Sequence, residues 1–286
     1  MLYFNNVTII GVGLIGGSLA KVLKTKKLAD RITGSGRSRN TLELALKLGV
    51  IDRIGQSPAQ SVEDADLVVL ASPVGTFETI VREIGPHLKR GAVLTDVGSV
   101  KGELVKKIEE AMPRGTQYVP AHPIAGGEKS GVAESTETLF QGRRCILTPT
   151  MKTDRTALES IRALWSATGA EVTIMDPAVH DKVFAAVSHM PHVAAFAMMS
   201  AVAELNTGAE DYLRFSGAGF KDFTRIAASS PEMWKDIFLM NGDNVVHMID
   251  RYLLSLGRFR QEILARDEKK LEQELKTASG IRRGLE

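Results

Sequence analysis

The feature that most constrains this chain is a glycine-rich turn that joins an apolar strand to a helix near its beginning. The segment "VTIIGVGLIGGSLAKVL" sets three glycines in the spacing G-x-G-x-x-G. The first permits a tight turn, the second lets a pyrophosphate approach the backbone, and the third lets the helix pack closely on the strand. The free N–H groups of the helix N-terminus attract phosphate. The segment therefore predicts a bound dinucleotide. The expected contacts in this turn are Gly11, Gly13, Leu14, Ile15 and Gly16.

The first 175 residues alternate short β-branched runs with segments of helical periodicity. Such alternation predicts a mostly parallel sheet with helices on both faces. After Asp176 and Pro177 the strand signals end and helical patterns take over. We therefore expect an α/β Rossmann-type domain with a mostly parallel sheet over residues 1–175, and an all-α domain over residues 176–286. The predicted strands are "VTIIG", "RITGS", "LVVLAS", "AVLTDVGS", "YVPAHP", "RCILTP" and "EVTIM", and the charged "RFRQEILARDEKKLEQELKTAS" is predicted as a single last helix.

Charge and cysteine content exclude several classes of protein. The 286 residues carry 36 Lys plus Arg against 34 Asp plus Glu, so no general positive field attracts nucleic acid or an acidic membrane. Cys145 is the only cysteine, which excludes an internal disulfide and the cysteine-rich zinc patterns, and no metal is expected. The first residues lack the basic region of a signal peptide. We expect a cytoplasmic protein.

One apolar stretch could be mistaken for a membrane span. "VFAAVSHMPHVAAFAMMSAVAEL" is long enough to cross a bilayer, but it holds His189, Pro191 and His192 near its centre. Ionisable groups inside a membrane are costly, so we expect a helix buried in protein. A helix that is apolar on all sides needs partners all round, which one small helical domain cannot supply. The stretch therefore predicts a homodimer built on the second domain.

The end of the second strand bears on the choice of cofactor. The adenosine ribose is usually bound by a carboxylate about twenty positions past the third glycine, and here that position is Gly36, followed by Arg37, Ser38 and Arg39. A carboxylate binds a 2′-hydroxyl and repels a 2′-phosphate, whereas guanidinium groups bind phosphate. We expect NADP to be preferred, with NAD possible. The plain alternative is a solvated basic turn.

The carboxyl ends of later strands should face one crevice, because open α/β sheets bind ligands there. "LTDVGSVKGEL" and "VPAHPIAGGEKSG" both lie at such ends. His122 lies at a strand end, where a histidine is less often a packed core residue, and histidine suits acid–base work near neutral pH. Ser99 is expected to begin a helix as its N-cap, which is compatible with touching a substrate. Cofactor contacts are also expected at Ser72, Pro73, Val97 and Gly98.

Five segments in order carry a resemblance to a known family. "GVGLIGGSLA", "TDVGSVKG", "HPIAGGEKSG", "VSHMPHVAAFA" and "GAGFKDFTRIAASSPEMWKDIF" resemble successive signatures of the prephenate and arogenate (cyclohexadienyl) dehydrogenases of tyrosine biosynthesis. The resemblance implies NAD(P)-dependent oxidative decarboxylation of prephenate or arogenate. Hydride leaves the carbinol carbon for the nicotinamide, carbon dioxide is lost, and the ring becomes aromatic as 4-hydroxyphenylpyruvate or tyrosine.

The resemblance also implies roles for particular residues. His122 would take the proton of the ring hydroxyl, and Ser99 would help to hold that hydroxyl or the histidine. Arg225 would bind the substrate carboxylate with a bidentate fork. A salt bridge with Asp222, three residues earlier on the same helical face, is the alternative for Arg225. His192 would line the substrate pocket; without the resemblance it is expected to be a core histidine.

One departure from the family pattern bears on the substrate. After "HPIAG" many relatives have threonine, whereas this chain has Gly127 followed by Glu128. Glu128 would attract the ammonium group of arogenate, so we favour arogenate slightly over prephenate. Tyrosine is expected to inhibit at the active site, since it resembles the substrate. The rival interpretations are a reductase similar to the β-hydroxyacid dehydrogenases, which typically use a lysine in the helical domain, and a non-catalytic NADP-binding sensor.

Overall fold

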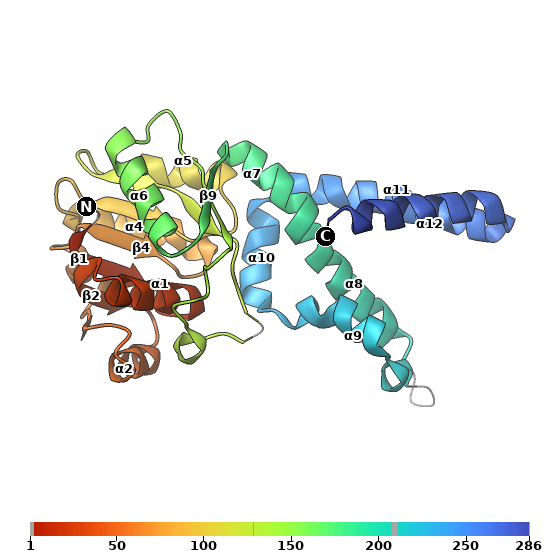
Figure 1. Cartoon of the computed structure of the whole chain (residues 1–286), viewed down its shortest axis with the longest axis horizontal. Helices are drawn as coiled ribbons and strands as arrows, with labels where there is room; N and C mark the ends of the chain where they lie inside the picture. Colours follow the sequence, from red (N-terminus) through yellow and green to blue (C-terminus); the bar gives the residue numbers. More distant parts are fainter. Residues whose placement is uncertain (1–2, 128, 207–210, 286) are drawn as a thin grey trace.

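The computed structural model describes residues 3–127, 129–206 and 211–285, and it shows an α/β domain followed by a helical domain (Figure 1). The first domain contains a parallel six-stranded sheet in the order β3-β2-β1-β4-β5-β6 and a small sheet in the order β7-β8-β9. The expected fold class is confirmed. The strands are β1 (Phe4–Ile10), β2 (Ala29–Ser35), β3 (Arg53–Ile54), β4 (Leu67–Leu70), β5 (Val93–Asp96), β6 (Gln117–Val119), β7 (Ala121–Pro123), β8 (Arg144–Leu147) and β9 (Glu171–Ile174).

Helices cover both faces of the large sheet, because successive side chains of its central strands point to opposite sides. Ile9 packs into a cluster with residues of α1, α2 and α6, whereas Ile10 packs into a second cluster with residues of α3, α4 and α5. Both isoleucines are almost fully buried. The helices of this domain are α1 (Leu14–Thr25), α2 (Arg39–Lys47), α3 (Pro58–Val62), α4 (Phe77–Ile84), α5 (Gly102–Ala111) and α6 (Arg155–Ala167).

One predicted strand is two strands in the structure. The run "YVPAHP" divides at Pro120 into β6, which joins the parallel sheet, and β7, which pairs antiparallel with β8. Proline has no N–H to donate to a sheet ladder, so the strand cannot continue through it in one sheet. The carbonyl of Pro120 instead accepts a hydrogen bond from the Thr148 N–H at 3.0 Å. The division turns His122, in β7, away from the ladder of the large sheet. The two-residue strand β3 was not predicted.

The second domain extends from the first as two arms in Figure 1, one formed by α8 with α9 and the other by α11 with α12. The predicted last helix is wrong: the chain reverses at Arg266, which adopts left-handed backbone angles, and Asp267 caps the next helix through the Lys270 N–H. The elements are α7 (Pro177–Phe184), a π-helical turn (Ala185–His189), α8 (Met190–Glu204), α9 (Ala218–Thr224), α10 (Pro231–Met240), α11 (Gly242–Ala265) and α12 (Glu268–Arg283).

The second domain leaves much of its apolar surface uncovered in the single chain. Among the described residues, one helical stretch, Pro177–Glu204, is long and apolar enough to cross a membrane by length and composition alone. Only 28% of its most apolar window is buried, and in α8 the buried residues are Met190 and Ala195. The single chain therefore does not supply the burial expected for this helix. An uncovered apolar face of this kind is typical of an assembly surface.

Candidate functional site

The glycine-rich turn between β1 and α1 has the geometry of a phosphate site. Gly11 has a φ of +103°, and a Cβ added there would lie 2.5 Å from the Ala71 backbone. A Cβ at Gly16 would lie 2.3 Å from the Gly11 carbonyl oxygen, so close packing requires glycine at both positions. A Cβ at Gly13 would meet no protein atom within 4 Å. Packing therefore does not explain Gly13, whereas the close approach of a pyrophosphate to the helix N-terminus does. Leu14 and Ile15 form the first turn of α1 at this site.

The ends of β4 and β5 lie beside this turn. Ile10 pairs with Leu70, and Leu70 pairs with Asp96, so the three strands end in line. The Ser72 hydroxyl is 2.8 Å from the Thr76 hydroxyl, and Pro73 precedes a short 3₁₀ turn, Val74–Thr76. Val97 and Gly98 follow β5 directly. The predicted cofactor contacts are thus brought to one edge of the sheet.

The basic segment after β2 is divided among three different partners. Ser38 caps α2, because its hydroxyl oxygen accepts the Thr41 N–H at 3.2 Å. Arg39 lies along α2 and pairs with Glu43 at 2.9 Å. The Arg37 guanidinium lies 3.5 Å from the Glu232 carboxylate of α10, in the other domain, and its side chain is 76% exposed. Arg37 therefore lies where the two domains face each other, at the rim of the predicted crevice.

His122 belongs to a buried chain of polar groups that crosses the domain junction. Its Nδ1 lies 2.8 Å from Nε2 of His180, and Nδ1 of His180 lies 2.8 Å from Oδ1 of Asp181. A carboxylate only accepts, so His180 donates to Asp181 and its Nε2 accepts from His122. This assignment leaves Nε2 of His122 with a free lone pair, as a general base requires. Phe184 packs against both imidazole rings.

Burial keeps both imidazoles neutral. It lowers the pKa of His122 well below its ordinary value, and the nearby His180 and Lys101 act in the same direction. Burial also lowers the pKa of His180, although the hydrogen bond to Asp181 opposes this change. A neutral imidazole can accept a proton, so the surroundings of His122 favour the form that a base needs.

Ser99 is not a helix cap, contrary to expectation. Helix α5 begins three residues later, at Gly102. The N–H groups of Lys101 and Gly102 donate to the two carboxylate oxygens of Asp181, both at 2.8 Å. A side chain from the second domain thus caps a helix of the first and satisfies donors that no residue within α5 can reach. Ser99 lies half-buried in the loop between β5 and this cap.

A second cluster of rings lies in the helical domain. His192 stacks on Trp234 with the ring centroids 3.6 Å apart, and its Nδ1 donates to the Ser188 carbonyl at 2.9 Å. Its Nε2 is therefore the nitrogen left for a ligand. Burial lowers the pKa of His192, and the positive charge of Arg225 adds to this effect. The structure thus brings together His192 and Arg225, two of the predicted substrate contacts.

The π-helical turn shapes this region. It inserts a wider turn between α7 and α8, a feature often found at functional sites. His189, at the end of the turn, is fully buried, and Asn241 lies between it and the Asp181 carbonyl, 3.1 and 2.8 Å away. Burial lowers the pKa of His189 to about 4, with Asp181 and the Ser99 backbone acting in the opposite direction.

The loop after β7 reaches back toward the phosphate turn. A Cβ at Gly127 would lie 3.4 Å from the Leu14 side chain, which is van der Waals contact, so this loop lies beside the start of α1. Glu128, the predicted ammonium contact, lies outside the described residues. No group of three or more metal-ligating side chains occurs within the part of the chain that the structure describes.

Sequence reasoning missed the partners of His122. His180 and Asp181 stand in "MDPAVHD", which marks the start of a helix and so hides their second role. Asn241 lies between two helices and carries no motif. A histidine beside an aspartate in an otherwise apolar segment was the signal available for the pair.

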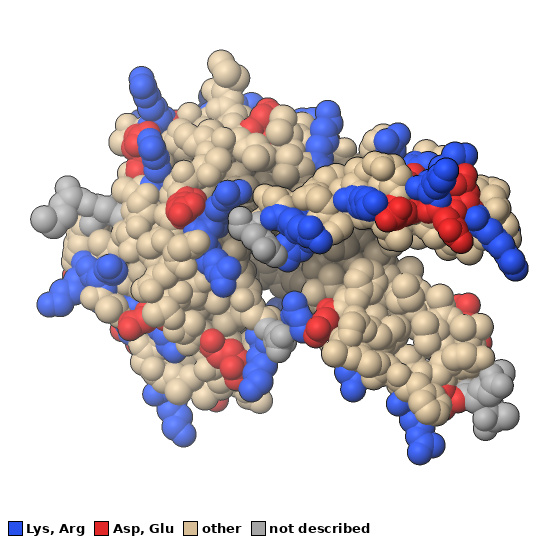
Figure 2. Space-filling view, turned by 45° about the vertical axis from the view of Figure 1, so that its right-hand side comes forward, with Lys and Arg blue, Asp and Glu red and all other residues tan. Residues whose placement is uncertain are grey.

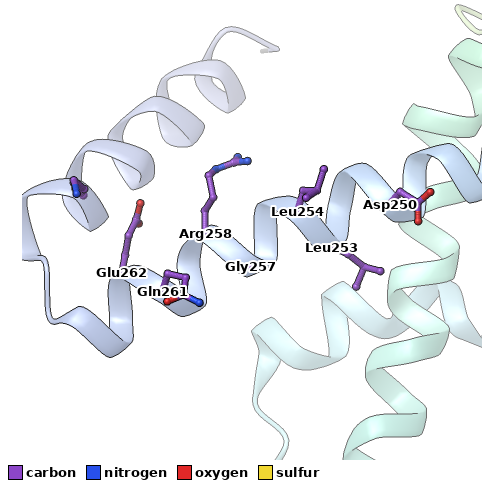
Figure 3. Close-up of a pocket in the computed structure, with 8 residues that line it drawn as sticks. Asp250, Leu253, Leu254, Gly257, Arg258, Gln261 and Glu262 are labelled. Carbon is purple, nitrogen blue, oxygen red and sulfur yellow. The ribbon is translucent and has the colours of Figure 1, made fainter.

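The α11–α12 arm carries a separate groove, lined by two leucines and by charged and polar side chains. Leu253 and Leu254 are 58% and 60% exposed, and the groove continues past Gly257 to Arg258 (Figure 3). Arg258 points toward α12 and donates to Glu274 at 3.0 Å. In Figure 2 charged side chains gather along this arm, whereas the recess between the two arms is largely uncharged. The arm presents leucines to solvent that a partner subunit would cover.

Two family models match the chain. Residues 19–174 match the nucleotide-binding domain of prephenate dehydrogenase, and residues 176–277 match its dimerization domain. The prephenate dehydrogenase of Bacillus subtilis is 36% identical over 282 residues, which cover 98% of this chain and 76% of that protein. The cyclohexadienyl dehydrogenase of Zymomonas mobilis is 32% identical over 288 residues, covering 100% of this chain and 97% of that protein.

Solved structures agree with this match. Prephenate dehydrogenase from Aquifex aeolicus, in complex with hydroxyphenyl propionate and NAD+, superposes with a TM-score of 0.94 at 40% identity and covers 99% of this chain and 98% of its own. Synechocystis arogenate dehydrogenase superposes with a TM-score of 0.81 at 26% identity and covers 98% and 100%. A 3-hydroxyisobutyrate dehydrogenase at 11% identity and a TM-score of 0.55 shares the fold alone, so the β-hydroxyacid dehydrogenase alternative is not favoured. The chain therefore belongs to the prephenate dehydrogenase family, as an oxidoreductase whose nucleotide-binding domain is followed by a dimerization domain.

Proposed function

We propose that this protein oxidises and decarboxylates arogenate or prephenate with a nicotinamide cofactor, and that His122 is the catalytic base. The observation that carries the proposal is the chain from Asp181 through His180 to His122, which leaves Nε2 of His122 free and its ring neutral. Relatives named prephenate, cyclohexadienyl and arogenate dehydrogenase support this reaction class.

His122 would take the proton of the ring hydroxyl while hydride departs from the carbon that bears this hydroxyl. The bound nicotinamide supplies the hydride acceptor. As the proton arrives at Nε2, the imidazole becomes positively charged, and His180 and Asp181 behind it stabilise that charge. Their hydrogen bonds also fix the ring, so little reorganisation accompanies the transfer. Ser99, in the adjoining loop, would help to orient the hydroxyl.

The turn after β1 and the ends of β4 and β5 would hold the cofactor. The open space at Gly13, the free N–H groups at the start of α1 and the tight packing at Gly11 and Gly16 fit a pyrophosphate. The remaining proposed contacts are Leu14, Ile15, Ser72, Pro73, Val97 and Gly98.

NADP is proposed as the preferred cofactor. Gly36 leaves the end of β2 without a carboxylate, and the exposed Arg37 guanidinium is available to a 2′-phosphate. Ser38 and Arg39 would support it from the start of α2. The Aquifex relative holds NAD+, so both cofactors need to be measured.

Arg225 and His192 are proposed to bind the substrate. Arg225 would form a bidentate pair with a carboxylate, and His192, held flat against Trp234, would offer its Nε2. Gly127 and Glu128 are proposed to face the substrate side chain, with a slight preference for arogenate. Tyrosine would compete at this site, so strictly noncompetitive inhibition would contradict its binding there.

The remaining features of the proposal concern the whole protein. We propose a division into residues 1–175 and 176–286, a homodimer joined through the second domain, and a cytoplasmic location without nucleic-acid or membrane partners. Sedimentation as a monomer at micromolar concentration would contradict the dimer.

Two measurements test the reaction. Initial rates with arogenate or prephenate, each paired with NAD or NADP, give the substrate and cofactor preferences together. His122→Asn should lower kcat by about 100-fold to 10,000-fold, the usual contribution of a general base, while cofactor binding stays unchanged. A non-catalytic sensor would turn over neither substrate, and His122→Asn would not change its cofactor binding.

A further inference from the structure

A fully buried ion pair lies beneath the loop that carries Ser99. The Lys101 ammonium is 2.6 Å from Oδ1 of Asp96, and both side chains are 0% exposed. Oδ2 of Asp96 accepts the Tyr118 hydroxyl at 2.7 Å. The cost of removing two charges from water can equal or exceed their mutual attraction, so replacing a buried ion pair by well-packed apolar residues of similar size often leaves the stability unchanged or higher. The pair therefore calls for an explanation other than stability.

The two charges hold both sides of one residue, Gly98. Its N–H donates to Oδ1 of Asp96 at 2.7 Å, and its carbonyl accepts from the Lys101 ammonium at 2.8 Å. A Cβ at this position would come within 2.9 Å of Asp96 and of Val74, so Gly98 has no room to shift. Ser99 comes next in the chain. Its position relative to the crevice is thus set by Lys101 and Asp96.

Lys101 also joins this loop to the chain that ends at His122. Its backbone N–H donates to Asp181, the residue that accepts from His180. Its positive charge lowers the pKa of His122, after burial and His180, and it lowers the pKa of His180 as well. One residue therefore touches the Ser99 loop through its side chain and the histidine chain through its backbone.

We propose that Lys101 is a positioning residue for the reaction: its ammonium ion fixes Gly98 and Ser99 against Asp96, and its backbone N–H holds Asp181 at the end of the histidine chain. The role rests on the proposed function of His122 as the base. It requires a cation here, because a neutral side chain of the same length could fill the volume but could not bind the Gly98 carbonyl or repel a proton from the imidazole.

Several charged or titratable groups surround His122 and enter any test by pH. His180 approaches from α7, His189 from the π-helical turn and Lys101 from the start of α5. Asp181 acts through His180, Asp96 faces Lys101 and Tyr118, and the buried Cys145 of β8 contacts the His122 backbone. Of these, Lys101 is the cation. Replacing it should therefore raise the pKa of His122, because a positive charge is removed and Asp96 is left uncompensated.

The test compares Lys101→Met with Lys106→Met, which removes an exposed lysine of α5, the helix that begins just after Lys101. Lys101→Met should lower kcat by about 100-fold, as expected when a reacting group is displaced by about 1 Å, and move the acid limb of the kcat/KM profile to higher pH. NADP binding, measured by fluorescence titration, should weaken by less than about tenfold, because Gly98 is only one of the proposed cofactor contacts. Lys106→Met should match the wild type. A folded Lys101→Met dimer with wild-type kcat and pH profile overturns the proposal, as does a fall in kcat with an unmoved acid limb.

Two additions keep the test decisive. If the unpaired Asp96 unfolds the single variant, Asp96→Asn combined with Lys101→Met removes both charges; a kcat near the wild-type value in this double variant overturns the proposal. If the wild type turns over neither substrate, the proposed function fails. The Lys101 inference is then judged by NMR titration of the His122 ring, identified with His122→Asn. An unchanged midpoint in Lys101→Met overturns it.

Discussion

The domain junction and the rim of the crevice hold their polar groups in opposite ways. At the junction, Asp181, His180 and His122 are buried and linked at 2.8 Å. At the rim, Arg37 and Glu232 are 76% and 57% exposed and lie 3.5 Å apart. A buried network is expensive to leave incomplete, whereas an exposed pair contributes little. We therefore expect changes at the junction to alter stability and turnover, and changes at the rim to alter the cofactor preference alone.

Removing Asp181 should have the largest effect at the junction. Asp181→Ala leaves the N–H groups of Lys101 and Gly102 and the Nδ1–H of His180 without an acceptor, so the free energy of unfolding should fall by at least about 3 kcal/mol. Asp176→Ala is the matched control, because Asp176 caps α7 from an exposed position, where a lost cap costs about 1 kcal/mol. Urea denaturation at fixed protein concentration measures both. Equal losses would erase the distinction between junction and surface.

The second largest effect should come from acid, which should lower the free energy of unfolding through His189 at the junction. The pKa of His189 is about 4 in the folded protein and near 6.5 when unfolded, so below pH 6.5 the unfolded chain binds the extra proton. This contribution to stability is complete above pH 6.5 and is lost as the pH falls toward 4, by up to about 3 kcal/mol. Urea titrations between pH 7.5 and 4.5 test the loss. His189→Asn should show a shallower dependence on pH, and an identical slope would exclude His189 as its source.

A smaller effect is expected at the rim from Arg37→Ala. Loss of the guanidinium should raise the KM for NADP by about tenfold, equivalent to about 1.4 kcal/mol. The KM for NAD should stay within about twofold of the wild-type value. Arg82→Ala is the control, since Arg82 is an exposed arginine that pairs with Glu78 on α4, outside the proposed cofactor contacts. Initial-rate kinetics with each cofactor supply the comparison. Equal changes for NADP and NAD would reduce this segment to a solvated basic turn.

The smallest effect should follow Glu232→Gln. The carboxylate competes with a 2′-phosphate for Arg37 across the crevice, so its neutralisation should lower the KM for NADP by no more than a few fold, because exposed pairs are weak. Glu78→Gln, which frees Arg82 on α4 instead, provides the reference. A higher KM for NADP in Glu232→Gln would mean that Glu232 helps to place Arg37.

Part of the site could be predicted because the local backbone conformation requires particular residues. The roles of Gly11 and Gly16 follow from short-range geometry, and the structure shows the close contacts that require glycine. Pro120 could have signalled that "YVPAHP" divides, since proline interrupts a ladder. The reversal at Arg266 had a weaker signal, because no glycine or proline marks it and only the capping Asp267 does.

The junction could not be predicted from local patterns. His122 and His180 are 58 residues apart, and their contact exists only once α7 packs on the first domain. Lys101 would be placed on the surface by its residue type, since lysine is almost never fully buried without a partner. Its partner Asp96 is five residues away, across a loop whose path depends on the whole sheet.

The position of α7 has a consequence for recombination between relatives. His180 and Asp181 lie beyond residue 175 in the chain, yet they complete the surroundings of His122 and cap α5. A chimera joined at that point would keep its own histidine but receive the two residues behind it from the other parent. Exchanging the helical half to alter substrate choice would thus also change the surroundings of the proposed base, His122. Crossovers placed after Phe184 would keep His122, His180 and Asp181 from the same parent.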